Sequence, residues 1–382
     1  MIREGYKRLS DYIEPIDERN TSLQVKLSQG ICNNKYFITP RQVAENSAND
    51  KIVRTGHFAY NRATTRNGDK ISIAYREGPD CTVSSAYQIF RIKDENLLNP
   101  YYLWMWFRRP EFDRYARFKS RGSAHEFFEW DEMCDVYLPL PDIDTQRRIV
   151  AEYQAVESRI AANEQLIESL ENTAQSIYKK MFVDDIDLGN LPDGWRIGTL
   201  EDLGEIVSGA TPSTEMPEYW DDNGIAWLSP ADLSHDKTLF MRRGAKSISK
   251  LGYQSASTRL LPIGTVLFSS RAPIGLMAIS ASELCTNQGF KSIVPKSEVG
   301  TEYTFYVLSN LKDRIANENT GATFAEVSGS SLKMYEAVIP SATITAKFSE
   351  MVKPLHRHID NIEQENKLLE ETMSLLLSKL SY

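Results

Sequence analysis

Two segments of the chain carry apolar residues at alternating intervals of four and three positions. The first segment runs from Ile149 to Met181 and the second from Phe348 to Leu380, and each position of the first lies 199 residues before its counterpart. This heptad spacing predicts two long helices that pair as a coiled coil. The seam residues we expect are Ile149, Tyr153, Val156, Ile160, Asn163, Ile167, Leu170, Ile177, Val352, Leu355, Ile359, Ile362, Asn366, Leu369, Leu376 and Leu380.

Each ladder contains one polar seam residue, Asn163 in the first and Asn366 in the second. A polar seam residue costs stability but fixes the register and orientation of the helices. The two asparagines face one another if the helices pair antiparallel, and each reaches solvent if the ends of the seam fray. Pro354 lies inside the second ladder, where it predicts a kink or a restart of the helix near residue 353.

The repeat continues upstream of both ladders. The segment "RGSAHEFF" at 121–128 matches "TGATFAEV" at 320–327, "HFAYNRATT" at 57–65 resembles "VLFSSRAPI" at 266–274, and "YQIFRI" at 87–92 resembles "FKSIVP" at 290–295. "LPDGW" at 191–195 begins the second copy, and Tyr6 takes the place of Trp195 in the first. The chain therefore contains one arrangement twice.

Short strand-like runs alternate with helical runs in each globular part, which predicts a mixed α/β (α+β) fold. We expect a globular domain at 1–144, a helix at 145–183, a linker at 184–192, a second globular domain at 193–343 and a second helix at 344–382.

Composition is that of a soluble globular protein, with 41% hydrophobic and 25% charged residues among 382. No stretch is long and apolar enough for a transmembrane helix, and residues 1–15 lack a signal-peptide core. The four cysteines lie far apart without a CxxC pair, which favours reduced thiols and a cytoplasmic location. We expect no membrane partner.

Charge is unevenly distributed along the chain, although the net charge of −8 by itself disfavours a nucleic-acid partner. Residues 237–282 contain seven Lys or Arg and no Asp or Glu, residues 101–125 contain six basic and two acidic residues, and residues 51–76 contain six basic residues and Asp69. Such tracts favour a surface that meets a polyanion. Chance clustering on solvated faces is the alternative.

Motifs for catalysis are weak in this sequence. "NPYY" at 99–102 is similar to the NPPY loop of amino-methyltransferases but lacks the second proline, so we interpret Asn99 as a helix cap and Pro100 as its first turn. There is no phosphate-binding GxxxxGK[ST] motif. We interpret His356 and His358 as solvated helix residues rather than metal ligands, and we expect no metal site.

The order of domain, helix, domain and helix resembles the specificity subunit of type I restriction–modification systems. The residues that carry the resemblance are "LPDGW" (191–195), "LPLPDIDTQRRI" (138–149), "TNQGFKSI" (286–293), "NTGATF" (319–324) and "NKLLEETMSLLLSKL" (366–380). It implies two target recognition domains, each reading one half of a split sequence in double-stranded DNA. It also implies helices that set the spacing between half-sites and dock the methyltransferase (modification) subunits, expected to be two.

By the same resemblance, the chain is a non-catalytic subunit without cofactors. S-adenosylmethionine, ATP and Mg²⁺ would be bound by the partners, which include a restriction (motor–nuclease) subunit. The first ladder would measure ~50 Å as a helix, longer than the ~34–36 Å of one DNA turn. The alternative function is a coiled-coil scaffold with protein-binding globular domains and no role on DNA.

Arginine suits guanine edges, and asparagine or glutamine suits adenine edges, whereas phosphate contacts only position a protein. On that basis the candidate DNA-binding residues are Arg54, Arg62, Arg66, Asn67, Lys70, Arg117, Lys119 and Arg121 in the first domain, and Arg242, Arg243, Lys250, Arg271, Asn287, Gln288, Lys291 and Thr323 in the second.

Overall fold

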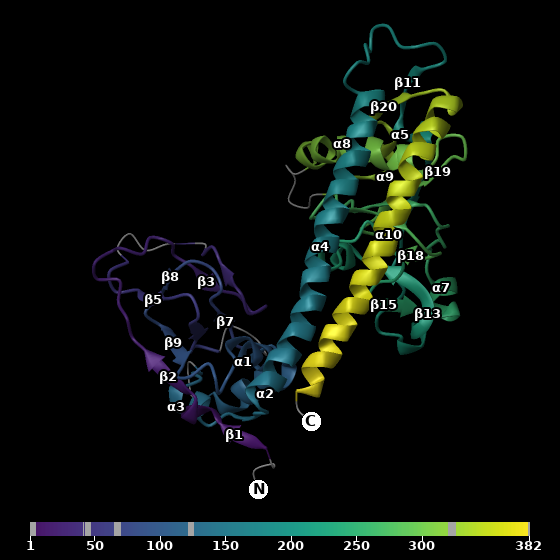
Figure 1. Ribbon diagram of the computed structural model, residues 1–382. Helices are drawn as coiled ribbons and strands as arrows, with labels where there is room; N and C mark the ends of the chain where they lie inside the picture. The colour runs from purple at the N-terminus through teal and green to yellow at the C-terminus, as the bar shows by residue number, and fades with distance from the viewer. Residues whose placement is uncertain are drawn as a thin grey trace. The chain divides into compact units, whose positions relative to one another are not determined.

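The computed structural model describes residues 5–40, 42, 47–64, 70–120, 126–319 and 326–380. The chain divides into two compact units, of which unit 1 contains residues 1–161 and 368–382 and unit 2 contains residues 162–367 (Figure 1). Both boundaries fall inside the long helices α4 (Ile143–Phe182) and α10 (Ala342–Lys379). Each long helix therefore contributes one segment to each unit.

Unit 1 is built around a four-stranded antiparallel sheet. Its strands in spatial order are β2 (Ile13–Ile16), β9 (Tyr87–Ile92), β6 (Phe58–Asn61) and β7 (Ile73–Tyr75). Three short ladders pair β1 (Tyr6–Arg8) with β10 (Tyr137–Pro139), β3 (Gly30–Ile31) with β4 (Phe37–Ile38), and β5 (Lys51–Val53) with β8 (Cys81–Val83). The short helices are η1 (Leu9–Asp11), α1 (Pro100–Phe107), α2 (Pro110–Lys119) and α3 (Trp130–Cys134).

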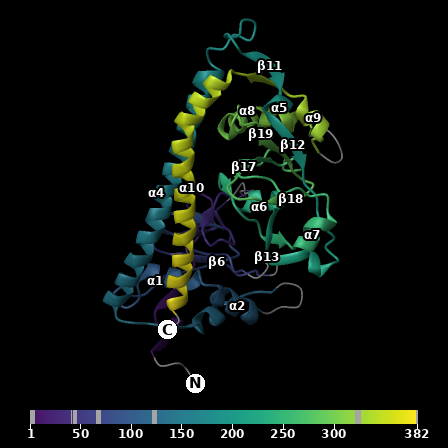
Figure 2. The same ribbon diagram turned by 90° about the vertical axis from the view of Figure 1, so that its right-hand side faces the viewer.

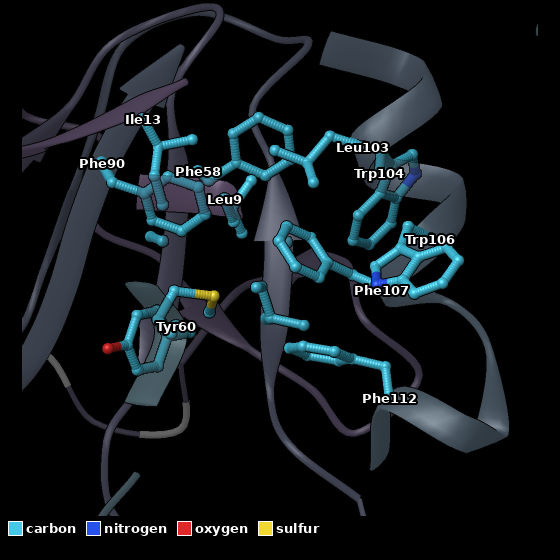
Figure 3. Close-up of a cluster of buried hydrophobic side chains, with 14 of the residues drawn as sticks. Leu9, Ile13, Phe58, Tyr60, Phe90, Leu103, Trp104, Trp106, Phe107 and Phe112 are labelled. Carbon is cyan, nitrogen blue, oxygen red and sulfur yellow. The ribbon is translucent and has the colours of Figure 1, made fainter. Parts of the chain in front are cut away.

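Aromatic side chains fill the core of unit 1 between this sheet and α1 (Figure 3). Phe58 and Phe90 are opposite each other in the β6–β9 ladder, and their rings stack with centroids 5.0 Å apart. Phe107, the last residue of α1, meets both rings edge-on at 5.8 and 6.1 Å. Because each aromatic ring buries a large apolar area, this cluster holds strands that are only three to six residues long.

The start of α1 confirms the interpretation of "NPYY". The Asn99 side chain accepts hydrogen bonds from the backbone N–H groups of Tyr101 (2.9 Å) and Tyr102 (3.1 Å), and Pro100 occupies the first helical position. The backbone N–H of Asn99 donates to the buried Gln146 side chain of α4. The motif therefore caps a helix and ties it to the long helix that follows the domain.

Unit 2 contains a five-stranded sheet and a three-stranded sheet. The first, in spatial order, is β12 (Gly204–Ser208), β19 (Lys291–Pro295), β16 (Val266–Phe268), β17 (Met277–Ser280) and β14 (Phe240–Met241). The second is β15 (Lys246–Ile248), β13 (Trp220–Leu228) and β18 (Cys285–Thr286). β11 (Arg196–Thr199) pairs with β20 (Glu336–Ile339), and the short helices are α5 (Leu200–Leu203), η2 (Pro217–Tyr219), α6 (Pro230–His235), α7 (Lys250–Ser255), α8 (Thr301–Glu318) and α9 (Gly329–Lys333).

The sheet topology confirms the internal repeat. The order β2-β9-β6-β7 in unit 1 reappears as β12-β19-β16-β17 in unit 2, and the end ladders β1–β10 and β11–β20 also correspond. The buried hydroxyl of Tyr102 donates to the Pro139 carbonyl, and that of Tyr303 donates to the Val338 carbonyl, which lies 199 residues after Pro139. The repeat therefore extends to individual hydrogen bonds.

The expected equivalence of Tyr6 and Trp195 is wrong. Tyr6 pairs with Pro139, whereas the partner of Val338 in the second copy is Ile197. The second copy has two extra residues before its first buried leucine, and the register of an antiparallel ladder fixes which residues correspond. Ile197 therefore stands where Tyr6 stands, and Trp195 precedes the strand.

The long helices pack against each other through the expected seam, and none of the sixteen predicted seam positions is exposed. In unit 1, Ile149 and Tyr153 of α4 join the cluster that contains Leu376 and Leu380. In unit 2, the rings of Tyr178 and Phe182 of α4 pack on the ring of Phe348 near the start of α10. No helix in the described part of the chain has an apolar stretch that could cross a membrane.

The asparagine pair confirms the antiparallel orientation within unit 2. The Asn163 amide Nδ2 donates to Asn366 Oδ1 at 2.7 Å, and Asn163 is buried. Farther along α4, the ring of Phe182 lies 5.2 Å from that of Phe348, so rising numbers on α4 meet falling numbers on α10 (Figure 2). The two polar seam residues satisfy each other, which removes most of the cost of burying them.

The structure bears on two expectations for α10. The helix does not restart near Pro354, because it runs without interruption from Ala342 to Lys379, while the kink at this residue stays a prediction. Pro354 is exposed, so water can reach the carbonyl that its missing N–H leaves free. His356 is not solvated but 4% exposed, and its Nε2 lies 3.1 Å from the Tyr306 hydroxyl, whereas His358 is exposed. Among the described residues, no group of His, Cys, Asp or Glu side chains gathers as a candidate metal site.

Candidate nucleic-acid interface

Four candidate cations of unit 1 contact carboxylates, at two separate places. Arg54 binds Glu18 and, at 2.7 Å, Asp80. Three others form ion pairs around the segment that follows α2: Arg62 with Glu129 (3.3 Å), Arg117 with Glu126 (2.6 Å) and Lys119 with Glu132 (2.8 Å). The segment of Arg62 meets that of Glu126, the partner of Arg117, because the backbone of Phe128 donates to the Arg62 carbonyl and that of Thr64 to the Glu126 carbonyl.

Lys70 differs from these cations because it is exposed and makes no ion pair with a described residue. The backbone beside it is fixed, since the Ile71 N–H donates to the buried Asp113 carboxylate at 3.1 Å. Asp113 also forms a buried ion pair with Lys35 at 2.7 Å. The other candidates of this domain, Arg66, Asn67 and Arg121, lie outside the described residues, as does Thr323 of the second domain.

Four candidates of unit 2 come together where strands β12, β16 and β19 reach their loops. Arg271, Asn287, Gln288 and Lys291 belong to two segments joined by the hydrogen bond from Ser270 N–H to the Gly289 carbonyl. Thr211 approaches from the end of β12, and its hydroxyl donates to the Gln288 side chain. Glu326 approaches from the other side, in an antiparallel bridge with Arg271. We call these six residues, Thr211, Arg271, Asn287, Gln288, Lys291 and Glu326, the loop edge of unit 2.

The Glu326 carboxylate contacts both cations of the loop edge. Its carboxylate lies 3.0 Å from the Arg271 guanidinium and 3.8 Å from the Lys291 ammonium. The Lys291 side chain is only 11% exposed, and burial lowers the pKa of its ammonium, while Glu326 opposes that shift. Arg271 and Glu326 are exposed at 46% and 37%, so their polar ends reach the surface side by side while Lys291 supports them from within.

The remaining candidates of unit 2 do not join the loop edge. Arg242 forms an ion pair with Asp360 of α10 at 2.7 Å. Arg243 donates to the backbone carbonyl of Asp222 and to the Ser247 hydroxyl. Lys250 is the exposed first residue of α7. The structure thus separates residues that the sequence analysis grouped as one basic tract.

Tertiary ion pairs bring acids to the tract at 237–282, which contains no acid in its own sequence. Arg242, Arg259 and Arg271 from this tract contact Asp360, Glu205 and Glu326, which come from elsewhere in the chain. A surface ion pair contributes only about 0–1 kcal/mol, so a phosphate can displace the carboxylate at little cost. In the folded protein these three arginines nevertheless do not form a surface free of acids.

Sequence reasoning missed Thr211 and Glu326. The choice of cations and amides as DNA contacts passed over Glu326, an acid inside the repeated segment "TGATFAEV" at 320–327. The corresponding segment of unit 1 also places acids, Glu126 and Glu129, against arginines. An acid at this place in both copies was the available signal.

Comparison with known proteins finds similarity to type I specificity subunits. Residues 192–371 match the model of the type I restriction modification DNA specificity domain. The HindI type I restriction enzyme specificity subunit of Haemophilus influenzae is 21% identical over 405 aligned positions, which cover 86% of this chain and 86% of that relative.

A second type I specificity subunit is more similar to this chain over a shorter stretch. The MjaIX specificity subunit of Methanocaldococcus jannaschii is 36% identical over 187 residues, which cover 48% of this chain and 43% of that relative's length. The crystal structure of the type I restriction–modification S subunit from M. genitalium has the same fold, with a TM-score of 0.62, 12% identity and coverage of 99% of this chain and 96% of that one.

Proposed function

We propose that this chain is the DNA-recognition subunit of a type I restriction–modification complex, in which each unit reads one half of a split sequence. The observation that carries the proposal is the repeated sheet with different side chains at equivalent loop positions. In unit 2, Arg271 bridges Glu326, whereas in unit 1 the corresponding bridge joins Ala63 and Phe127. A repeated sheet that carries different loop side chains in its two copies is suited to recognition of two different half-sites.

The spacing between the half-sites is set by the paired helices in this proposal. The buried Asn163–Asn366 hydrogen bond fixes the register of the pair within unit 2. Adding or deleting four residues in one long helix is expected to change the number of unspecified base pairs and to leave both half-sites unchanged. An unchanged gap would contradict this part of the proposal.

The long helices also dock two modification subunits in this proposal, and a restriction subunit joins the complex. Leu368 and Leu375 of α10 are one heptad apart and more than 60% exposed, although they are large apolar residues. Replacing both with glutamate is expected to reduce co-purification of the modification subunits. Replacing the exposed Glu371 with glutamine in the same helix segment is the control and should leave co-purification intact.

Catalysis belongs to the partners in this proposal, and this chain positions them on DNA. S-adenosylmethionine, ATP and Mg²⁺ are assigned to the modification and restriction subunits. Calorimetric titration of the isolated chain with S-adenosylmethionine is expected to give no heat of binding, whereas the chain assembled with its modification subunits should bind it. Binding by the isolated chain would contradict the assignment.

The deciding experiment is genome-wide mapping of methylated adenine in the native host, with and without this gene. Loss of methylation at one split motif would support the proposed role and identify both half-sites. If methylation is unchanged while the modification subunits are expressed and co-purify with this chain, the role in DNA recognition is wrong. A scaffold that binds only proteins would give that second result.

A further inference from the structure

The loop edge of unit 2 places the Glu326 carboxylate and the Arg271 guanidinium side by side at the surface. Arg271 and Glu326 are held by their backbones, which pair in an antiparallel bridge, and by an ion pair of 3.0 Å. Exposed Gln288 lies in the same edge, where Thr211 fixes its side chain. The edge therefore offers a guanidinium, a carboxylate and an amide within one small area.

A carboxylate in this position does not suit contact with phosphate, because like charges repel. In the major groove, however, cytosine presents the N4 amino group, which donates to Glu or Asp, and guanine presents O6 and N7, which accept from Arg. These groups are neighbours within one G·C base pair. The charges of Arg271 and Glu326 match that pattern of acceptor and donor, whereas an A·T pair offers thymine O4 and a methyl group in place of the cytosine amino group.

We propose that Arg271 and Glu326 together read one G·C base pair in the half-site of unit 2. Arg271 donates to guanine O6 and N7, and Glu326 accepts from cytosine N4. The inference rests on the proposed function, since it assigns a specific base pair to one of the two recognition domains.

Lys291 acts as a positioning residue for this pair. Its ammonium lies 3.8 Å from Glu326 and, at 3.4 Å, donates to the Gln288 carbonyl, while its side chain is nearly buried. Its positive charge attracts the Glu326 carboxylate and holds it beside Arg271 when the negative potential of DNA approaches. Lys291→Met is therefore expected to reduce discrimination at the same base pair, whereas Lys291→Arg, which keeps the charge, should retain it; loss of packing alone would not give that difference.

Unit 1 does not repeat the Arg271–Glu326 bridge. Its corresponding bridge joins Ala63 and Phe127, and its nearby Arg–Glu pairs, Arg62 with Glu129 and Arg117 with Glu126, come from other positions of the repeat. Changes at the loop edge of unit 2 should therefore leave the half-site of unit 1 unchanged. That half-site serves as an internal reference in every measurement.

The test uses the full chain assembled with its modification subunits. The wild-type complex selects its sites from a pool of random DNA duplexes, and Arg271→Ala and Glu326→Gln complexes are compared with it on duplexes that differ at single base pairs. Both variants are expected to lose about ten- to one-hundred-fold discrimination at one shared G·C pair. Because both side chains are exposed, the unfolding midpoints of the variants should match the wild type.

Arg259→Ala provides a matched control. Arg259 and Glu205 form a similarly exposed ion pair in the same unit, away from the loop edge, and the variant should keep the wild-type motif. If Arg271→Ala and Glu326→Gln weaken all sequences equally, or if the affected position is an A·T pair, the inference is wrong. If the wild-type complex selects no split motif at all, the proposed function fails instead, so the two failures are distinguishable.

Discussion

The strands beside the central sheets keep their pairing directions in both units. In unit 1, β8 pairs antiparallel with β5 and bridges Ser28 in parallel, and in unit 2, β18 pairs parallel with β13 while Leu284 beside it bridges Leu261 antiparallel. The central sheets also keep one strand order. The bridge at the loops differs instead, because it joins Ala63 and Phe127 in unit 1 but Arg271 and Glu326 in unit 2. Burial thus constrains the sheets, whereas the side chains at the loops have diverged, as the proposed reading of two different half-sites requires.

The strongest test of this comparison removes one buried side chain from the central sheet of each unit. Phe90 and Ile293 occupy corresponding positions, opposite Phe58 and Val266, and all are fully buried. Phe90→Ala should cost about 3–5 kcal/mol, and Ile293→Ala about 2–5 kcal/mol. Hydrogen exchange should accelerate in the sheet of the mutated unit. Equal acceleration in both sheets would show that the units do not unfold separately.

A second test uses the residues at corresponding positions of α4 and α10, Glu157 and His356. Glu157 is partly exposed and accepts from the Tyr101 hydroxyl, whereas His356 is buried, and burial lowers its pKa from 6.5 to about 4. The folded state resists protonation of this histidine, so its contribution is complete above pH 6.5 and is lost as the pH falls toward 4. The loss is on the order of 3 kcal/mol.

His356→Gln, which keeps an acceptor for the Tyr306 hydroxyl, should remove this part of the pH dependence of unfolding measured in urea. Glu363 works in the opposite direction, because burial raises its pKa from 4.5 to about 7, so its contribution is complete below pH 4.5 and is lost as the pH rises through 7. The difference between wild type and variant isolates the histidine. His358→Gln, on the exposed side, should behave like the wild type, and an identical pH profile for His356→Gln would contradict the prediction.

The third test concerns the seam, which contains a polar pair in unit 2 and aromatic and aliphatic residues in unit 1. Asn163→Leu leaves the Asn366 amide without its partner and should cost about 1–3 kcal/mol. Replacing both asparagines with leucine should recover that loss, as a double-mutant cycle in urea would show. Asn361→Leu, at an exposed position of α10, should change stability by less than about 0.5 kcal/mol. A double variant as unstable as the sum of the single variants would argue against a coupled pair.

The smallest effect separates two cations of unit 1. Lys70 is exposed and makes no ion pair with a described residue, whereas Arg54 binds Glu18 and Asp80. If both meet phosphates, Lys70→Ala should reduce the salt slope of DNA binding by about one. Arg54→Ala should reduce it by less, because Arg54 must first leave its carboxylates. Equal slopes for the two variants would show that the ion pairs of Arg54 do not matter.

The sequence was sufficient wherever a periodic pattern reports burial. The heptad ladders predicted α4 and α10, and the similar segments upstream of them predicted that one globular arrangement occurs twice. Asn163 and Asn366 could be matched because they stand at different positions of the two ladders and face each other only when the helices pair antiparallel. Asn99 and Pro100 could be interpreted because capping depends only on neighbouring residues.

The rest depends on contacts between distant segments, which local patterns do not record. Arg242 meets Asp360, and Arg271 meets Glu326, only after the chain has folded, so a tract without acids in sequence acquires them in space. His356 is buried because Tyr306 and Phe240 surround it, although the polar residues Arg357 and His358 follow it directly in sequence. The boundary of each unit inside α4 and α10 is likewise a property of tertiary packing.

That boundary has a consequence for synthesis of the protein. Leu376 and Leu380 complete the core of unit 1 together with Ile149 and Tyr153, yet the ribosome makes them after the whole of unit 2. At about 5–20 residues per second, the N-terminal part of unit 1 waits roughly 10–40 seconds with this apolar face of α4 uncovered. During that interval the nascent chain offers a binding site for a molecular chaperone, and unit 2 can finish folding first although it begins later.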